Sequence, residues 1–283
     1  MSGTLSSPRV SYRVDGPLFI IQLDEPETLN SLTFDDFVYI ATLLEKSNDL
    51  PETHFTVIQS SGKFFSAGGK FTSVLELAPG QKPKDNVEND TQLRTLYKLI
   101  GSVAAPNVYV TNAFVKHNKP IVCLLNRPAI GLAACLVCLS DIVYSRDDQV
   151  YLLFPFSSLG FVAEVGSSVT LYDKLGVNAT NEHLFFSTKI PYEELAGKIV
   201  VHSYAMSDTT EFNSRAAADL KKKCAHLSLP SLREMKKVLA HETRSKLRAA
   251  QALETNATLP FWIQGEPFKR FQDLQQKKRR HKL

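Results

Sequence analysis

The sequence predicts an α/β fold in which a core of alternating strands and helices comes first and a mostly helical section follows. Three observations support this prediction. Short apolar, β-branched runs lie between turn residues, amphipathic helical spacings separate them, and helical patterns dominate from about residue 205 onward. At 283 residues with 43% hydrophobic residues, the chain is long enough to bury a complete core.

The first cycle of strand, helix and strand lies near the N-terminus. Residues 18–23 (LFIIQL) form an apolar run between turn residues and predict a buried strand. Thr33 is a candidate N-cap for a helix, because acidic residues and then apolar residues at helical spacing follow it. Residues 55–59 predict a second strand, and the polar, aperiodic residues 79–90 predict a mobile surface loop.

A second cycle contains the remaining strands that we expect. Its elements are helices at 93–103 and 108–117, strands at 120–125, 141–144 and 150–153, and a turn at 126–132 that opens an apolar helix ending at 139. After residue 170 the pattern is mostly helical, up to a charged run with leucine spacing at 232–252. We therefore divide the chain into a core at 1–204, a helical section at 205–276 and a basic tail at 277–283.

Composition limits the class of function. The net charge is +4, but five positive charges lie in the last seven residues, so the rest carries 4 − 5 = −1 and nucleic-acid binding is disfavoured. No apolar run approaches the roughly 20 residues of a membrane-spanning helix, and the start lacks a secretory signal. The four irregularly spaced cysteines predict no disulfide framework. We expect a soluble intracellular protein without a nucleic-acid partner or a membrane span.

Cysteine spacing raises the question of a metal site. Cys135 and Cys138 have C-x-x-C spacing, but they lie in an apolar helix and no second ligand pair accompanies them. His117 and His183 are isolated in the sequence. Core packing is therefore the favoured interpretation, and we expect no metal.

Two turns between a strand and a helix are candidate functional sites. They are residues 64–71 (FFSAGGKF) and residues 127–133 (RPAIGLA). A turn of this kind presents backbone N–H groups at the positive end of a helix. Neither turn contains G-x-G-x-x-G or G-x-x-x-x-G-K-[ST], so a dinucleotide or P-loop site is not indicated. A tight connector without a ligand is the alternative.

Glu164 is the third candidate, in the apolar stretch at 159–168 (LGFVAEVGSS). Its neighbours predict partial burial, and burial raises the pKa of a carboxyl group until it can act as acid and base near neutral pH. The alternative interpretation is a glutamate at a helix N-terminus that the helix dipole stabilises.

Together these motifs resemble the enoyl-CoA hydratase/isomerase (crotonase) superfamily over residues 10–271. The segments that carry the resemblance are F-S-A-G-G, N-R-P-A-I-G-L, D-I-V-Y and L-G-F-V-A-E-V-G. The chain is most similar to the fungal peroxisomal isomerases that convert 3-enoyl-CoA to 2-enoyl-CoA or 3,5-dienoyl-CoA to 2,4-dienoyl-CoA. The resemblance implies a crotonase-type core of repeated ββα turns, a fatty-acyl-CoA substrate and no cofactor. It also implies trimers or hexamers, either homo-oligomers or mixed with a paralogous isomerase.

The resemblance also implies roles for individual residues. The backbone N–H groups of Gly69 and Leu132 fall at the oxyanion-hole positions, and Glu164 falls at the position of a catalytic acid and base. Substrate contacts are implied for Ala67, Gly68, Gly69, Lys70, Phe71 and Leu132. Lys70 replaces a frequent aspartate, and it either approaches a CoA phosphate or is solvated. Arg127 replaces a frequent glycine.

Two departures from the family pattern indicate the reaction. Hydratases carry further glutamates where this chain has Cys135 and Phe156, and mammalian-type dienoyl isomerases carry acids at both positions. One carboxylate is enough for a 1,3 shift, in which Glu164 takes a proton from C2 and returns it at C4. The sequence therefore predicts isomerisation of 3-enoyl-CoA to trans-2-enoyl-CoA in peroxisomal β-oxidation. A 3,5-dienoyl-CoA isomerase and a catalytically weak acyl-CoA-binding paralogue are the alternatives.

The last three residues predict the location. His281, Lys282 and Leu283 have the form of the peroxisomal C-terminal address, whose type case is Ser-Lys-Leu. We expect a peroxisomal import receptor to bind this end of the chain.

Overall fold

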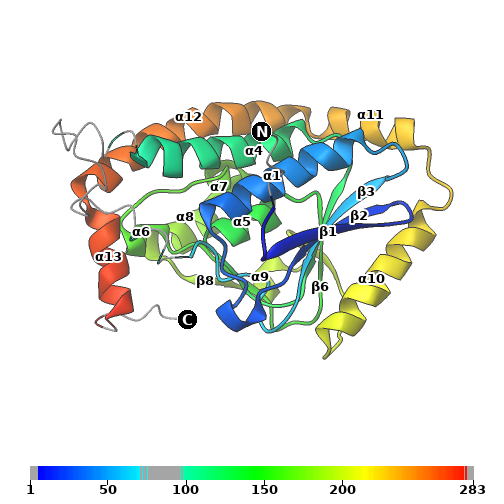
Figure 1. Ribbon diagram of the computed structural model, residues 1–283, viewed down its shortest axis with the longest axis horizontal. Coiled ribbons are helices and arrows are strands. Elements are labelled where there is room, and N and C mark those ends of the chain that lie inside the picture. Colours follow the sequence, from blue (N-terminus) through cyan, green and yellow to red (C-terminus); the bar gives the residue numbers. More distant parts are fainter. Residues whose placement is uncertain are drawn as a thin grey trace.

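The computed structural model describes residues 6–70, 72, 75, 96, 98–276 and 278. Its central feature is a six-stranded sheet in the order β1-β2-β3-β4-β6-β9, and a three-stranded sheet has the order β5-β7-β8 (Figure 1). In the larger sheet β1 and β2 are antiparallel and the other neighbouring strands are parallel. The strands are β1 (Val10–Asp15), β2 (Leu18–Leu23), β3 (Phe55–Ser60), β4 (Ile121–Leu125), β5 (Ala129–Ile130), β6 (Ile142–Ser145), β7 (Tyr151–Leu153), β8 (Lys189–Pro191) and β9 (Val200–Ser203).

Helices connect these strands, and the elements after β9 are helices. They are the 3₁₀-helix η1 (Pro26–Thr28), α1 (Phe34–Asp49), the π-helix η2 (Ile100–Ala104), α4 (Ala105–Lys116), α5 (Leu132–Leu139), α6 (Phe156–Leu159), α7 (Ser167–Leu175), α8 (Val177–Phe186), α9 (Tyr192–Leu195), α10 (Thr209–Cys224), α11 (Leu229–Leu239), α12 (His241–Gln264) and α13 (Glu266–Gln275). The α/β class and the helical C-terminal section are confirmed. Among the described residues no helix is both long and apolar enough to span a bilayer.

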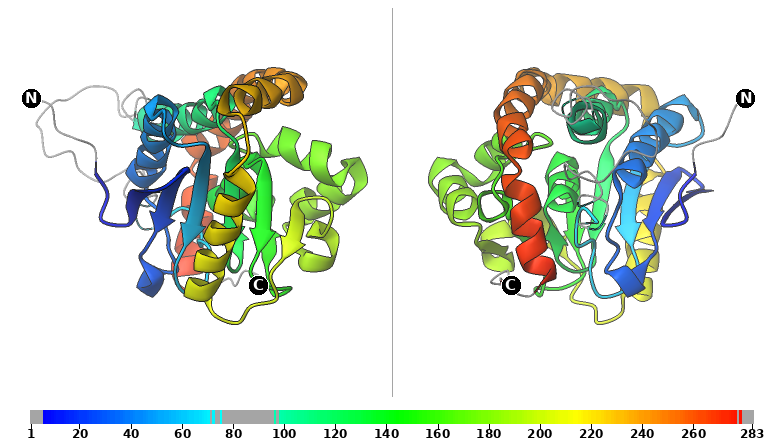
Figure 2. Two further views of the ribbon diagram at one scale, coloured as in Figure 1. Left: turned by 90° about the vertical axis from the view of Figure 1, so that its right-hand side faces the viewer. Right: turned by 60° about the vertical axis from the view of Figure 1, so that its left-hand side comes forward.

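The two faces of the large sheet bury different apolar clusters. On β2, Phe19 and Ile21 belong to the cluster on the side of α1, α4 and α5. Ile20 belongs to the cluster on the other side, where α10 contributes Phe212 and Leu220 (Figure 2). Because both faces are covered, β2 and β4 are nearly continuous apolar runs, which is the pattern that predicts them.

The start of α1 follows the predicted cap. The backbone N–H of Asp36 donates to Thr33 Oγ1 at 3.2 Å, and the Thr33 N–H donates to Asp36 Oδ2 at 2.8 Å. This reciprocal pair is a capping box. The N-cap that the sequence predicts at Thr33 is therefore confirmed.

Some elements differ from the sequence prediction. The sequence does not predict β1, β5, β8 and β9, because β1 is mostly exposed and the other three have only two to four residues. The helices expected at 93–103 and 108–117 are continuous where the structure describes them, since η2 leads directly into α4. Pro106 lies directly after the π-helical turn η2, and the backbone stays αR through Ala104 and Ala105, so the helix passes through the proline without a break. The loop expected at 79–90 lies outside the described residues.

The C-terminal helices pack on the core. The predicted run at 232–252 contains parts of two helices, α11 and α12, and α12 continues to Gln264. The helix α12 lies along α4 and also contacts α7 (Figure 1). Trp262 on α12 and Phe268 on α13 belong to the same apolar cluster as the strands. The C-terminal section therefore forms one wall of the region around Glu164.

Candidate active site

The two turns predicted from the sequence lie side by side. Ser66 and Ala129 form a parallel bridge between them. The Phe65 N–H donates to the Pro128 carbonyl at 3.0 Å, and the Ile130 N–H donates to the Ser66 carbonyl at 3.0 Å. This short ladder fixes the register of the two turns, so that Gly69 and Leu132 each lie three residues beyond the bridge.

The Gly69 N–H is directed away from the neighbouring segment around Leu32. The Leu32 N–H donates to the Gly68 carbonyl at 2.9 Å, and the Leu32 carbonyl accepts from the Lys70 N–H at 2.7 Å. Leu32 therefore pairs with the residues before and after Gly69. In an extended segment successive N–H groups point in opposite directions. Gly69 is exposed, and its N–H donates to no other described residue.

Leu132 offers a second backbone donor. It is the first residue of α5, so its N–H is one of those that an α-helix leaves without an internal partner. Within the described part of the chain this N–H makes no hydrogen bond. Gly131 has φ of 58° and precedes the helix, and its own N–H donates to the Leu153 carbonyl at 2.8 Å. The helix N-terminus is thereby held against β7.

A glycine allows the two turns to approach each other closely. A Cβ atom on Gly68 would lie 2.4 Å from the Ile130 carbonyl oxygen, and the φ of Gly68 is +85°. Both the contact and the dihedral disfavour any other residue. The first glycine of the Gly-Gly pair thus serves packing, whereas the second presents a free N–H.

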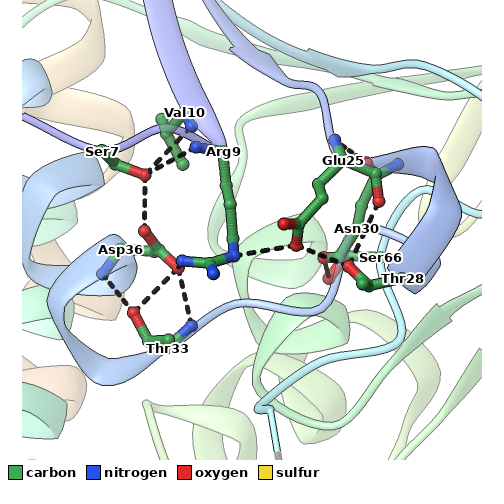
Figure 3. A network of polar contacts seen from close by, with 9 residues as sticks. All are labelled: Ser7, Arg9, Val10, Glu25, Thr28, Asn30, Thr33, Asp36 and Ser66. Carbon is green, nitrogen blue, oxygen red and sulfur yellow. Dashed lines mark hydrogen bonds and ion pairs between the residues drawn. The ribbon is translucent and has the colours of Figure 1, made fainter.

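Polar contacts around Asn30 hold the first turn in place, and Figure 3 shows those with Glu25 and Ser66. The Asn30 side-chain amide donates to the carbonyls of Ser61 at 2.7 Å and Phe64 at 3.0 Å, and its side-chain oxygen accepts from the Glu25 N–H at 2.8 Å. The Ser66 hydroxyl donates to the Asn30 carbonyl at 2.6 Å. These contacts tie the turn to the segment after β2.

The remaining residues of the predicted binding segment lie in different surroundings. Ala67 is half-buried, and its N–H donates to the Leu29 carbonyl at 2.9 Å. Lys70 is half-buried, and its charge adds to the Thr28 hydroxyl and Arg9, which lower the pKa of Glu25 more strongly. Phe71 and the C-terminal residues 281–283 lie outside the described residues.

Arg127, in the second turn, forms an ion pair. Its guanidinium lies 3.5 Å from Asp147 Oδ2, which also accepts from Arg146 at 2.8 Å. The arginine that replaces a frequent glycine therefore has a partner in the following connection.

Glu164 is almost completely buried, with 4% of its surface exposed. Its Oε1 accepts from the Thr258 hydroxyl of α12 at 3.1 Å. Burial raises the pKa of Glu164 to about 7; the Thr258 hydroxyl and the Asn107 side chain oppose this rise, and the charge of Glu254 adds to it. A carboxyl group with this pKa exchanges a proton readily at neutral pH.

The backbone after Glu164 is strained. Val165 has φ of 53°, in a region that β-branched residues rarely adopt, and Gly166 has φ of 74°. The Glu164 N–H donates to Ser167 Oγ at 3.1 Å, and α7 begins at Ser167. The turn therefore brings Glu164 close to the N-terminus of α7, which is the location that the sequence indicates.

The same region contains a second buried carboxylate that sequence reasoning missed. Glu254 of α12 accepts from the Gly166 N–H at 2.9 Å, from the Ser168 N–H at 3.1 Å and from the Ser168 hydroxyl at 2.5 Å. Glu164 and Glu254 line one cavity of about 10 Å³, which is the size of about one water molecule. The cavity is lined by Asn107, Val108, Thr111, Glu164, Val165, Gln251, Glu254, Thr255 and Thr258.

The two positions that lack the family's acids are apolar. Cys135, in the first turn of α5, is buried, and its thiol donates to the Glu164 carbonyl at 3.4 Å. This contact joins Glu164 to the helix that begins at Leu132. Phe156 is buried 5.4 Å from Phe161, measured between ring centroids. It belongs to an aromatic cluster formed by Phe154, Phe156, Phe161, Trp262, Phe268 and Phe271.

Trp262 connects this aromatic cluster to Glu164. Its indole N–H is near enough to lower the pKa of Glu164 slightly, but it does not reach hydrogen-bond geometry. Glu254, Thr258 and Trp262 follow each other at intervals of four residues on α12, so they lie on one face of that helix. This spacing is the signal in the sequence that could have identified them.

The described residues offer no group of three His, Cys, Asp or Glu side chains placed to bind a metal ion. Cys135 and Cys138 are buried free thiols, and burial raises the pKa of Cys138 to about 11. The chemistry that the arrangement supports is proton transfer by the buried carboxyl group of Glu164, whose backbone Cys135 links to the helix that begins at Leu132.

Comparisons with known proteins find a family model and relatives that match most of the chain. Residues 14–262 match the family model described as "Enoyl-CoA hydratase/isomerase". The chain is 53% identical over 277 residues to the Delta(3,5)-Delta(2,4)-dienoyl-CoA isomerase of Saccharomyces cerevisiae, covering 98% of this chain and 100% of the relative. It is 40% identical over 278 residues to the 3,2-trans-enoyl-CoA isomerase of the same yeast, covering 97% of both.

A solved structure shows a similar fold. An enoyl-CoA hydratase/isomerase from Mycobacterium paratuberculosis superposes with a TM-score of 0.78 at 25% identity, covering 94% of this chain and 98% of that chain.

Proposed function

The chain belongs to the enoyl-CoA hydratase/isomerase family, and from this premise we propose that it is an isomerase that moves a double bond within an unsaturated fatty-acyl-CoA. The buried Glu164 carries this proposal. Its pKa of about 7 suits a group that takes up a proton and returns it to another carbon of the same molecule.

Glu164 acts first as a base and then as an acid. As a carboxylate it removes a proton from C2 of a 3-enoyl thioester, and the electron pair of that C–H bond moves toward the thioester carbonyl. The resulting dienolate spans C2 to C4. When Glu164 returns the proton at C4, the double bond lies between C2 and C3. The substrate and product differ only in the position of one proton and one double bond, so no co-reactant is needed.

The free N–H groups of Gly69 and Leu132 stabilise the charge that develops on the thioester oxygen. Backbone donors of this kind strengthen as the oxygen becomes negative, and each contributes roughly 3 kcal/mol to transition-state stabilisation. The residues around them, Ala67, Gly68 and Lys70 together with Phe71, would contact the CoA moiety. The ladder that fixes the register of the two turns supports this role, because it holds both donors without using them.

Two substrate classes have separate support. The absence of acids at Cys135 and Phe156 favours 3-enoyl-CoA, because one carboxylate transfers a proton over the short distance from C2 to C4. The 53% identity with a yeast dienoyl-CoA isomerase favours 3,5-dienoyl-CoA, against 40% for the yeast enoyl-CoA isomerase. In that case the proton travels from C2 to C6 or two groups share the transfer. We propose 3-enoyl-CoA as the better substrate on the chemistry of the site and dienoyl-CoA as the second candidate.

A direct comparison of rates distinguishes the candidates. Purified protein is mixed separately with 3-enoyl-CoA and 3,5-dienoyl-CoA, and the ultraviolet absorbance of each conjugated product is followed. A higher kcat/KM for 3-enoyl-CoA supports the first proposal, and a higher value for the dienoyl substrate establishes the second. Acyl-CoA binding without either conversion would identify a catalytically weak paralogue and overturn both.

The location and the assembly of the enzyme are also proposals. His281, Lys282 and Leu283 support import into the peroxisome through the receptor that reads such an end. Membership of the family supports a trimer or hexamer, and sedimentation of the purified protein would test it.

A further inference from the structure

A second carboxylate, Glu254, lies beside the proposed proton carrier and has no role in the mechanism above. Glu254 is 6% exposed. It lies on α12, 88 residues after Gly166 in the sequence. Its two oxygens accept three hydrogen bonds, two from backbone N–H groups and one from a hydroxyl. All three donors belong to Gly166 and Ser168, just beyond Glu164.

This contact holds a turn that is unfavourable by itself. Val165 has φ of 53°, and the conformation of such a residue must be imposed by its surroundings. The contacts of Gly166 and Ser168 with Glu254 fix the chain on the C-terminal side of Val165. On the N-terminal side, Cys135 contacts the Glu164 carbonyl. The direction in which the Glu164 side chain leaves the backbone is set between these two points.

We propose that Glu254 is a positioning residue for Glu164: its carboxylate clamps the turn at 165–168 and so fixes the place from which Glu164 exchanges its proton. The same helix delivers the Thr258 hydroxyl to Glu164 Oε1 at 3.1 Å, one helical turn further on. The helix α12 thereby controls both the backbone and the side chain of Glu164. This inference rests on the proposed role of Glu164.

The charge of Glu254 gives the proposal a measurable consequence. Among the described residues, the titratable groups that face Glu164 are Glu254 from α12 and Cys135 from α5, while α4 contributes the neutral Asn107. Nearby like charge disfavours ionisation, so Glu254 raises the pKa of Glu164 in addition to the effect of burial. Burial raises the pKa of Glu254 as well, but its three hydrogen bonds oppose that rise.

A simple helix cap would behave differently. A carboxylate that only stabilised the N-terminus of α7 would, when removed, lower stability and leave kcat unchanged, although the loss of its charge would still lower the pKa of Glu164. A carboxylate that positions and polarises Glu164 changes kcat and the pH profile together. The two interpretations therefore separate in the kinetics.

The test compares two substitutions of Glu254 in the full-length protein, with the more rapidly converted of the two acyl-CoA substrates. Glu254→Gln removes the charge and cannot accept from both backbone N–H groups. Glu254→Asp keeps the charge but is one methylene too short to span them. Glu242→Gln is the matched control, since it makes the same change on an exposed part of α12.

We expect Glu254→Gln to lower kcat at least about tenfold with KM within about twofold, because the oxyanion donors lie on other turns. The acidic limb of its kcat/KM profile should move to lower pH by about half a pH unit or more. Glu254→Asp should lower kcat but leave the limb in place, and Glu242→Gln should match the wild type. Unchanged kcat in both Glu254 variants, or reduced kcat without any movement of the limb in Glu254→Gln, would overturn the proposal. If Glu254→Gln does not fold, Glu254→Asp alone tests the clamp, and a lower kcat in this variant supports it.

A second measurement does not depend on turnover. The infrared band of the protonated Glu164 carboxyl, identified by its loss in Glu164→Gln, should have a midpoint of about pH 7 in the wild type. Its midpoint should fall in Glu254→Gln and stay in Glu242→Gln. A wild type without isomerase activity would refute the proposed function, whereas an unmoved midpoint in Glu254→Gln would refute the role of Glu254.

Discussion

Glu164→Gln tests the proton carrier directly. Glutamine keeps the size of the side chain and can still accept from Thr258, but it cannot remove a proton from C2. We expect kcat/KM to fall at least about a thousandfold, in the range found when a general base is lost. Binding of a saturated acyl-CoA should stay within about threefold, because the donors at Gly69 and Leu132 are unaffected. In the wild type, kcat/KM should rise with pH through about 7, since the base must be ionised.

The same substitution should also change stability in a pH-dependent way. Burial raises the pKa of Glu164 from 4.5 to about 7 in the folded protein. Well below pH 4.5 the carboxyl is protonated in both the folded and the unfolded state, so its pKa shift does not change the free energy of unfolding. As the pH rises toward 7, the unfolded chain ionises and the folded chain keeps its proton, so the folded state is progressively destabilised. Above pH 7 the difference corresponds to about 3 kcal/mol of unfolding free energy, which Glu164→Gln should recover.

Urea unfolding at fixed protein concentration measures this difference at a series of pH values. The free energy of unfolding of Glu164→Gln relative to the wild type should increase between pH 4.5 and about 7 and then level off. Glu242→Gln, at an exposed position, serves as the control. A variant that keeps isomerase activity would refute the single-base mechanism, and a stability difference independent of pH would show that Glu164 is not buried as a proton-exchanging acid.

Three further outcomes are expected, two from the structure and one from the last residues of the sequence. Thr258→Val removes a donor that lowers the pKa of Glu164, so the acidic limb of kcat/KM should move to higher pH, and an unmoved limb would count against this contact. Gly68→Ala would place its Cβ 2.4 Å from the Ile130 oxygen at φ +85° and should cost about 1 to 3 kcal/mol of unfolding free energy in urea titrations, whereas Gly69→Ala meets no atom and should cost less than about 1 kcal/mol. Equal losses in the two glycine variants would contradict the close approach of the turns. Deleting Leu283 should leave a folded enzyme in the cytosol of cells that lack a full-length relative, and microscopy showing peroxisomal import of the truncated chain would disprove the address.

The sequence determined much of the fold because local physical preferences and tertiary packing agree there. The strands β2, β3 and β4 are buried on both faces, so their apolar runs are visible without any knowledge of their neighbours. The capping box at Thr33 is a local interaction within four residues. By contrast, β1 and β9 are largely exposed strands at the edges of the sheet, and only pairing with a distant strand makes them regular.

The sequence by itself also pointed to Glu164 and to the turns at Gly69 and Leu132, because an acid among apolar residues and a Gly-rich turn before a helix are local patterns. Only the tertiary structure placed Glu254 and Thr258 beside Glu164, since they lie about 90 residues later: their spacing puts them on one face of α12 but does not say what that face packs against. The physical reason is that burial, hydrogen bonds and nearby charges set the pKa of a carboxyl group. For Glu164 the residues that supply them are distant in the sequence and come together only in the folded protein.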